Sequence, residues 1–405
     1  MSKVPHIFIL AGESSGDRLG AALMRRLREE TNGTVWISGV GGEAMIAEGL
    51  EPVFPMQDIA VMGLVEIVPH LRRIRERMKQ ATDAILQTRP DALVTIDAQV
   101  FSGLLAKRIR RAAPDTTLIH YVAPTVWAWK PWRARKLAGY LDRVLALFPF
   151  EPPYFEKEGL TCDFVGHPVV ERVAALSNGA GPNLRAELGI APDAKVLLVA
   201  PGSRRSEISR LGRPFGDTAE RLAELYPELE IILPVAGAVA DEVREIALAW
   251  PSKTHILDPR GLPFAEAETR KFSAFAAADF ALAASGTVTL ELAAFRVPMV
   301  VGYRMPKFNE FILRRIMTVD TGTLVNIITG EKIVPEFWQD DCSGDKLAEG
   351  LRRLMENEEA RNNQVAGFDR AFEALGESDA PPSIRAAQSV LSALTEKTQR
   401  LSTDM

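Results

Sequence analysis

Short runs of apolar residues alternate along the chain with longer segments in which apolar residues recur every three or four positions. The first run, residues 7–11, is followed by a glycine-containing loop and a helical pattern over residues 19–30. Short continuous apolar runs predict strands that are buried on both faces, and the longer pattern predicts amphipathic helices. The other predicted strands lie at residues 35–40, 92–97, 118–122, 144–148, 196–200, 231–235, 280–284 and 299–301.

The alternation breaks at residues 177–183, Ser-Asn-Gly-Ala-Gly-Pro-Asn, whose composition is typical of a linker. Beyond residue 344 only helical patterns remain, at residues 346–357, 361–375 and 383–396. Strands that alternate with helices on each side of a linker predict an α/β fold with two doubly wound domains facing a cleft, followed by C-terminal helices.

Composition narrows the class of protein. A chain of 405 residues suits two or three domains. The net charge of −5 argues against nucleic acid as a partner, and two cysteines cannot build a disulfide framework. The early apolar run is too short for a signal peptide, and no run is long enough to span a membrane. We therefore expect a cytosolic protein.

Histidine and carboxylate spacing argues against a metal. The five histidines have no ligand spacing, and the sequence contains no Asp-x-Asp. We expect neither a metal nor a cofactor.

Loops that follow parallel strands are where ligands bind in such sheets. The first of them, residues 12–17 (Gly-Glu-Ser-Ser-Gly-Asp), matches neither the Walker A motif nor Gly-x-Gly-x-x-Gly. Ser14 or Ser15 would also serve as a helix N-cap, and glycines spaced four apart suit helix-on-sheet packing. Ligand contact and a purely structural role both stay open here.

Two loops in the second half suit phosphate. Residues 201–204, Pro-Gly-Ser-Arg, place an arginine at a helix start, where its charge opposes the helix dipole unless an anion binds. Residues 285–287, Ser-Gly-Thr, present N–H and hydroxyl donors at another helix start. Glu291 can accept from a ribose diol, or it is a buried group in a capping arrangement.

Asp97 ends the apolar strand at residues 92–97. A carboxylate at that point can act as a general base toward a bound ligand. Capping of the following helix is the alternative role. Trp127 belongs to a group of tryptophans that we interpret as an apolar wall near the cleft.

An apolar stretch at residues 61–68 precedes a basic helix pattern at residues 71–79. Such a surface suits anionic lipid headgroups, although a solvated helix face with a buried apolar stripe has the same pattern. The candidate membrane residues are Met62, Leu64, Val65, Arg72 and Arg73.

The motifs, in this order, resemble the lipid-A-disaccharide synthases, a glycosyltransferase family with the GT-B fold of two Rossmann-like domains. The most specific match is residues 120–129, His-Tyr-Val-Ala-Pro-Thr-Val-Trp-Ala-Trp. The other matching stretches are residues 11–17, 62–67, 148–151, 164–168, 201–204, 285–291, 301–304 and 324–330. One departure is Val100, where the family pattern has a second Asp, and this leaves Asp97 as the main acidic candidate.

The resemblance implies transfer of a 2,3-diacylglucosamine from UDP-2,3-diacylglucosamine to the 6-hydroxyl of 2,3-diacylglucosamine 1-phosphate. It implies inversion at the anomeric carbon, a β-1,6-linked lipid A disaccharide 1-phosphate, and release of UDP. The implied location is cytoplasmic and peripheral on the inner membrane, with its anionic lipids as partners. A UDP-N-acetylglucosamine 2-epimerase-like or other GT-B UDP-sugar enzyme is the alternative.

Domain and site predictions follow from this resemblance. Residues 1–176 form the acceptor and lipid side, residues 184–345 bind the UDP-sugar, and residues 346–405 are helices that pack back across the domains. Asp97 and Arg204 are the catalytic candidates. The UDP-sugar candidates are Gly202, Ser203, Arg204, Ser285, Gly286, Thr287, Glu291 and Asn326, and the acceptor candidates are Glu13, Ser15, Gly16, Asp17 and Trp127.

Overall fold

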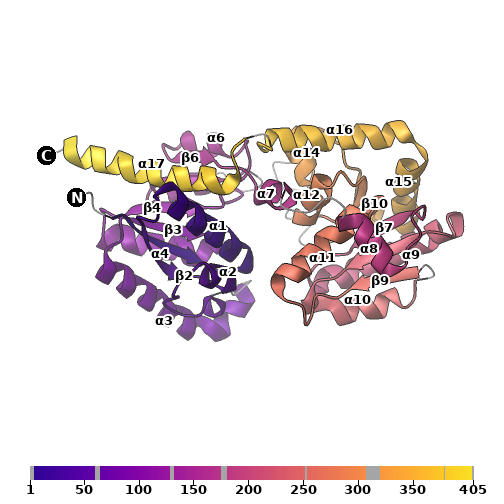
Figure 1. The fold of residues 1–405 in the computed structure, drawn as a ribbon, viewed down its shortest axis with the longest axis horizontal. Helices are drawn as coiled ribbons and strands as arrows, with labels where there is room; N and C mark the ends of the chain where they lie inside the picture. Colours follow the sequence, from indigo (N-terminus) through magenta and orange to yellow (C-terminus); the bar gives the residue numbers. More distant parts are fainter. Residues whose placement is uncertain are drawn as a thin grey trace. The chain divides into compact units, whose positions relative to one another are not determined.

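The computed structural model describes residues 4–59, 64–127, 132–174, 180–250, 253–306, 320–377 and 379–403. The chain forms two compact units (Figure 1). Unit 1 comprises Met1–Pro168 together with Ser378–Met405, and unit 2 comprises Val169–Glu377. The last helix of the chain therefore belongs with the N-terminal unit, whereas the two helices before it belong with unit 2.

Unit 1 contains a six-stranded parallel sheet with the order β2-β1-β3-β4-β5-β6. Its strands are β1 (His6–Ala11), β2 (Trp36–Val40), β3 (Ala92–Ile96), β4 (Thr117–Tyr121), β5 (Arg143–Ala146) and β6 (Thr161–Phe164). Its helices are α1 (Ser14–Glu30), α2 (Glu43–Ala47), α3 (Leu64–Thr88), α4 (Gln99–Ala112), α5 (Trp132–Ala138), α6 (Pro152–Glu156) and α17 (Pro382–Thr403). The short helix α7 (Pro168–Ala174) begins at the unit boundary.

Helices cover both faces of this sheet. Helix α17 packs on α1, β4 and β5, while α4 packs on α3, β3 and β4. Figure 1 shows α17 along one side of the unit and α3 along the other. Burial on both faces explains why the inner strands β1, β3 and β4 are fully buried apolar segments.

A buried arginine ties α17 to unit 1. Arg143 of β5 is 5% exposed, and its guanidinium lies 2.9 Å from Asp163 and 2.7 Å from Glu396 of α17. Arg385 of α17 donates to the Phe164 carbonyl at 2.6 Å. A buried guanidinium needs such paired acceptors, so the C-terminal helix is an integral part of this unit.

Unit 2 contains a second six-stranded parallel sheet, with the order β12-β11-β10-β7-β8-β9. Its strands are β7 (Val196–Ala200), β8 (Glu230–Pro234), β9 (Lys253–Leu257), β10 (Phe280–Ala284), β11 (Met299–Tyr303) and β12 (Glu336–Trp338). Its helices include α8 (Ala180–Leu188), α9 (Arg205–Leu225), α10 (Ala240–Ala247), α11 (Phe264–Ala277), α12 (Thr287–Ala294), α14 (Leu324–Thr329), α15 (Gly344–Glu356) and α16 (Glu358–Ala374). The predicted α/β class with two parallel sheets is confirmed.

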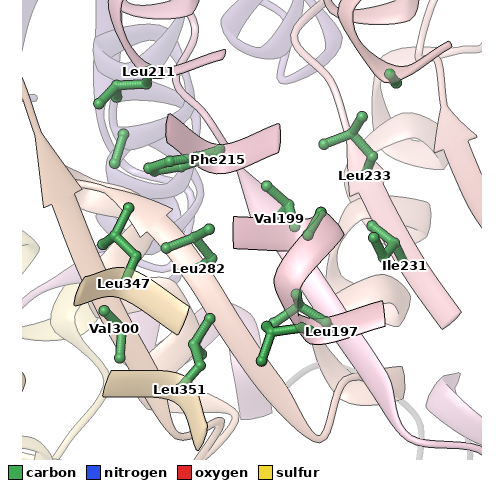
Figure 2. Close-up of a cluster of buried hydrophobic side chains, with 14 of the residues drawn as sticks. Leu197, Val199, Leu211, Phe215, Ile231, Leu233, Leu282, Val300, Leu347 and Leu351 are labelled. Atoms are coloured by element: carbon green, nitrogen blue, oxygen red, sulfur yellow. The ribbon is translucent and has the colours of Figure 1, made fainter. Parts of the chain in front are cut away.

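The core of unit 2 lies between its sheet and the helices α9 and α15. Side chains at alternate positions of a strand share one face, as Leu197 and Val199 of β7 do. Figure 2 shows these side chains packed with Leu211, Phe215, Ile231, Leu233, Leu282, Val300, Leu347 and Leu351. Burying a large apolar side chain contributes about 1.5–3 kcal/mol, so this cluster fixes the strands whose loops carry the candidate residues.

The predicted linker at residues 177–183 is only partly correct. Its last four residues already form the first turn of α8, which begins at Ala180. Pro182 does not prevent this, because the first turn of a helix makes no use of the missing N–H. The first part of the predicted linker, up to residue 179, lies outside the described residues.

Candidate active site

Each sheet has one point where the strand order reverses, and ligands bind at such points in open α/β sheets. In unit 1 the point lies between β1 and β3, which are adjacent although β2 comes between them in sequence. The loops after these strands touch. A Cβ on Gly12 would lie 2.4 Å from the Cβ of Ala98, so only glycine fits there without movement.

The loop after β3 has an unusual backbone. Asp97 and Ala98 have φ angles of 53° and 45°, and Val122, after the neighbouring β4, has a φ of 77°. Such values are uncommon for residues other than glycine and exceptional for a β-branched one. Strain of this kind gathers at functional sites.

Asp97 occupies this strained position at the carboxyl end of β3. Its N–H donates to the Tyr121 carbonyl at 3.1 Å, and its own carbonyl accepts from Ser102 Oγ at 2.7 Å. Burial raises the pKa of the Asp97 carboxyl, while a hydrogen bond from the Ala98 N–H opposes the change. A buried carboxyl whose pKa is raised is a stronger base when ionised.

Asp17 has a role that the sequence did not reveal. Its carboxylate is buried and accepts from the backbone N–H groups of Gly42, Ala44 and Met45 at 2.7, 2.9 and 3.1 Å. It therefore caps α2 from a distant part of the chain. Of the other candidates in this loop, Ser15 is exposed and Gly16 is buried, where an added Cβ would lie 3.3 Å from the Ile96 carbonyl oxygen.

Glu13 is the N-cap residue of α1, and its side chain makes no cap hydrogen bond. The sequence suggested Ser14 or Ser15 for that position, and both instead lie in the first turn of the helix.

Trp127 packs in a buried aromatic cluster. Its indole Nε1 donates to Glu151 Oε1 at 3.1 Å, and its ring contacts Phe150 edge-on at 5.1 Å. The other carboxylate oxygen of Glu151 accepts from the N–H groups of Leu147 and Phe148. Burial raises the pKa of Glu151 to about 7. Glu151 was part of a matching motif, but only the structure shows that it holds Trp127.

In unit 2 the strand order reverses between β7 and β10, which brings residues 201–204 and 285–287 to one edge of the sheet. Gly202 has a φ of 118°, which allows a sharp turn before α9. Glu207, in the first turn of α9, accepts from the N–H groups of Ser203 and Arg204 at 2.9 and 3.2 Å. The backbone N–H groups of this predicted phosphate loop are thus bonded to the Glu207 carboxylate.

The Arg204 guanidinium remains accessible. Its side chain is 67% exposed and lies 3.2 Å from Glu207 Oε1. Glu207 therefore orients the arginine as well as the turn before it. The sequence showed the arginine, whereas the role of Glu207 became apparent from the hydrogen bonds.

The second predicted phosphate loop, residues 285–287, is exposed at two of its three residues. Gly286 is the N-cap of α12, and both Gly286 and Thr287 are exposed. Ser285 Oγ donates to the Gly322 carbonyl at 2.9 Å. Glu336 in turn accepts from the Gly322 N–H at 3.0 Å and from the hydroxyls of Thr321 and Thr323. Glu336, which sequence reasoning missed, thus anchors the segment beside Ser285.

Two further residues that we predicted to contact the UDP-sugar already interact with other residues of the protein. Glu291 lies 3.0 Å from Lys271 Nζ and 3.8 Å from Arg172. Asn326 is 2% exposed, and its amide makes four hydrogen bonds, to Thr321, to the Val334 carbonyl and N–H, and to the Ile333 N–H. Contact of Asn326 with uridine or sugar stays a prediction. For that contact to form, the Asn326 amide would have to give up one of these four hydrogen bonds.

The candidate membrane segment is partly described. Met62 lies outside the described residues, as do the side chains of Leu64 and Val65 in the first turn of α3. Arg72 is 94% exposed and pairs with Glu76, and Arg73 lies 3.4 Å from Asp58. Within the described ranges, no helix combines the length and the apolar character that crossing a membrane requires.

The described residues also contain no group of three or more His, Cys, Asp or Glu arranged to hold a metal ion. Val100, where the family pattern has an Asp, lies in the first turn of α4 and is 65% exposed.

Comparison of the sequence with known protein families shows which family the chain belongs to. The model of the family described as lipid-A-disaccharide synthetase matches residues 7–390. The chain belongs to the lipid-A-disaccharide synthase family. It is 48% identical to the lipid-A-disaccharide synthase of Rhodospirillum centenum, over 96% of this chain and 95% of that protein. The enzyme of Ruegeria pomeroyi is 45% identical, over 97% and 96% of the two chains.

Solved structures agree on the fold. The UDP-GlcNAc 2-epimerase of Neisseria meningitidis, bound to UDP-GlcNAc, superposes with a TM-score of 0.64 at 13% identity, over 96% of this chain and 100% of that one. The calicheamicin glycosyltransferase superposes with a TM-score of 0.57 at 18% identity, over 98% and 99% of the chains. The GT-B fold, the glycosyltransferase class and a part in lipid A disaccharide synthesis are thereby confirmed for this lipid-A-disaccharide synthase family member.

Proposed function

We propose that this protein transfers a 2,3-diacylglucosamine from its UDP conjugate to the 6-hydroxyl of 2,3-diacylglucosamine 1-phosphate, with inversion. The hydroxyl oxygen forms a bond to the anomeric carbon while the bond from that carbon to the diphosphate oxygen breaks. UDP leaves with the bonding electron pair, and the product is the β-1,6-linked disaccharide 1-phosphate. The hydroxyl proton passes to a base on the protein.

Asp97 is the base in this proposal. The observation that carries it is a partly buried carboxyl of raised pKa, held on strained backbone where the strand order of unit 1 reverses, which is where open α/β sheets bind ligands. The strain has no evident structural use, since a glycine would form the same bend more easily. Removing the proton as the new bond forms makes the hydroxyl oxygen a stronger nucleophile.

Arg204 and the N-terminus of α12 receive the departing diphosphate. The exposed guanidinium supplies a charge-assisted donor, and the exposed residues Gly286 and Thr287 begin α12, where the helix dipole favours an anion. Donors that are already oriented stabilise negative charge as it develops. Glu291, with its Lys271 partner, would accept a hydrogen bond from the ribose.

The acyl chains of both substrates give a reason for a membrane role. We propose that the enzyme works in the cytoplasm, bound reversibly to anionic lipids of the inner membrane through residues 62–68 and the exposed arginines of α3. Arg72, which is 94% exposed, is the described side chain that best supports this location.

One incubation tests the proposed reaction against an epimerase. Purified enzyme is given the UDP-sugar alone, or the UDP-sugar with the acyl acceptor phosphate, and products are identified by mass spectrometry. Transfer requires both substrates and yields the disaccharide with one UDP for each. Conversion of the UDP-sugar alone to an epimer, or to a free sugar, would rule the transferase out.

A further inference from the structure

A groove between α4 and α5 in unit 1 has no role in the reaction as described so far. Its volume is about 330 Å³, and Thr95 of β3 and His120 of β4 form its floor. Gln99, which lies two residues after Asp97, lines one part of it, and Tyr140 after α5 lines another. The groove therefore begins next to the proposed base.

The floor of the groove carries an unsatisfied polar atom. His120 is 4% exposed, and its Nδ1 lies 2.9 Å from Thr95 Oγ1. Its Nε2 has no hydrogen-bond partner in the described part of the chain. Burial lowers the pKa of His120 to about 4, so the ring is neutral at physiological pH. Buried polar atoms are nearly always bonded, and a ligand hydroxyl or amide would satisfy this one.

The ionic side chains that line the groove are all cations. Lys107 comes from α4, while Arg133 and Lys136 come from α5, and no carboxylate is among the lining residues. None of the three pairs with a carboxylate among the described residues. Arg133 instead donates to Gln99 Oε1 at 2.9 Å, and Lys136 lies 4.5 Å from the Trp132 ring centroid. Unneutralised cations around a groove attract an anion.

Apolar side chains are exposed on the same groove. Val100, Leu104 and Trp132 are 65%, 56% and 54% exposed, and all three line it. Scattered exposed apolar residues are ordinary, but three on one groove, beside three cations, fit a ligand that is itself apolar and anionic. A free sugar phosphate would leave these surfaces uncovered.

We propose that this groove binds the acylated phosphomonoester acceptor, with its phosphate at Lys107, Arg133 and Lys136 and an acyl chain along Val100, Leu104 and Trp132. A sugar hydroxyl or an acyl amide bonds His120 Nε2. The proposal rests on the proposed function and locates one of its two substrates. The same chemistry is present in an anionic phospholipid of the bilayer, so the test separates the two sources.

The test compares two charge-matched double variants. Lys107→Gln/Lys136→Gln removes two cations of the groove, whereas Arg108→Gln/Arg111→Gln removes two from the neighbouring surface of α4 that are not groove residues. The first should raise KM for the acceptor about tenfold or more, because a charge-assisted bond to phosphate is lost. It should leave KM for the UDP-sugar unchanged. The control should keep both constants within about twofold.

A second acceptor and a second variant make the result specific. With an acceptor that lacks the phosphate, the wild type and the groove variant should perform equally. Trp132→Ser, at a position that is 54% exposed, should raise KM for the acylated acceptor and not for a deacylated one. Equal loss in the control variant, or an unchanged acceptor KM in the groove variant, would overturn the proposal.

Binding without turnover separates this proposal from the proposed function. Equilibrium binding of the detergent-dispersed acceptor phosphate is measured in the absence of UDP-sugar. Acceptor binding that depends on Lys107 and Lys136, without any disaccharide formation, would uphold the groove and reject the reaction. Weaker sedimentation of the groove variant with phosphatidylglycerol vesicles, at an unchanged acceptor Kd, would mean a bilayer lipid and would overturn the assignment to the acceptor.

Discussion

The chain turns by different means in the two units at the points where the strand order reverses. In the loops after β3 and β4 of unit 1 the positive φ angles belong to Asp97, Ala98 and Val122, whereas in the loops after β7 and β10 of unit 2 they belong to Gly202 and Gly286. Glycine adopts such angles without strain, and other residues do so at about 1–3 kcal/mol each. Unit 1 thus keeps a carboxylate at a bend that glycine would make more easily. The difference agrees with the proposal that unit 1 supplies a reacting side chain and unit 2 supplies donors for an anion.

The candidate carboxylates of the two units also differ in their surroundings. Glu207 and Glu336 in unit 2 accept several hydrogen bonds, and Glu291 is paired with Lys271. The oxygens of these carboxylates are therefore already engaged by donors within unit 2. Burial instead raises the pKa of Asp97. We therefore expect the proton acceptor in unit 1. In unit 2 the candidate that stabilises the departing diphosphate is the exposed cation Arg204.

The strongest test of this division is Arg204→Ala. Loss of the cation that meets the departing diphosphate should lower kcat/KM by about 1000-fold, the effect of removing a preorganised donor to a developing charge. Arg205→Ala is the matched control, since Arg205 is 80% exposed and pairs with Glu242 at 2.7 Å. Steady-state kinetics and UDP binding of both variants decide the matter. A wild-type rate and UDP affinity in the alanine variant would remove Arg204 from the mechanism.

Asp97→Asn should have the next largest effect. Loss of a general base should lower kcat by about 100-fold while UDP affinity is retained. The base must be ionised, so the rate falls as pH falls through its pKa. Because the pKa of Asp97 is raised, this fall should begin at a higher pH than for an ordinary Asp, and the asparagine variant should lack it. A lower Tm with unchanged activity per folded molecule would instead make Asp97 a purely structural residue.

The pattern of apolar runs predicted the inner strands and missed three outer ones. The missed strands are β6, β9 and β12, and each lies at the edge of its sheet. These three strands are partly exposed and have polar residues in place of a continuous apolar run, as Lys253-Thr-His of β9 illustrates, whereas the edge strand β2 was predicted. A continuous apolar run indicates a strand that is buried on both faces, and β6, β9 and β12 are not buried in this way.

The sequence placed the candidate site on the right loops but could not assign the contacts within them. Asp17 was a plausible ligand residue by position, yet its partners lie at residues 42–45, on a different loop. Asn326 is likewise engaged with its own loop. Tertiary hydrogen bonds of this kind depend on which strands become neighbours, and no local pattern contains that information.

Close contact between the two loops of unit 1 gives a third test. Gly12→Ala would bring two Cβ atoms to 2.4 Å, so overpacking should lower the free energy of unfolding by about 1–3 kcal/mol. Ala98→Gly removes the opposing methyl group and eases a φ of 45°. The double variant should therefore recover the stability lost by Gly12→Ala, as measured by chemical denaturation. Additive losses would show that the two loops do not meet.

The smallest expected effect concerns the proposed membrane contact of unit 1. Arg72 and Arg75 are exposed on α3, whereas Arg77 is paired with Asp58 and is best left in place. A cation near an anionic bilayer contributes about 1 kcal/mol at most, and salt at 0.15 M screens it over about 8 Å. Arg72→Ser/Arg75→Ser should therefore weaken sedimentation with anionic vesicles by about three- to tenfold at that salt concentration, and more at lower salt.

The control for this last test lies in unit 2. Arg213 and Lys332 are 90% and 74% exposed there, so Arg213→Ser/Lys332→Ser makes the same change in net charge on the other unit. If net charge alone governs attraction to the vesicles, both double variants lose binding equally. A loss confined to the α3 variant places the contact on unit 1, where the acyl acceptor is proposed to bind. Equal binding of all proteins to neutral and anionic vesicles would leave α3 as an ordinary solvated helix.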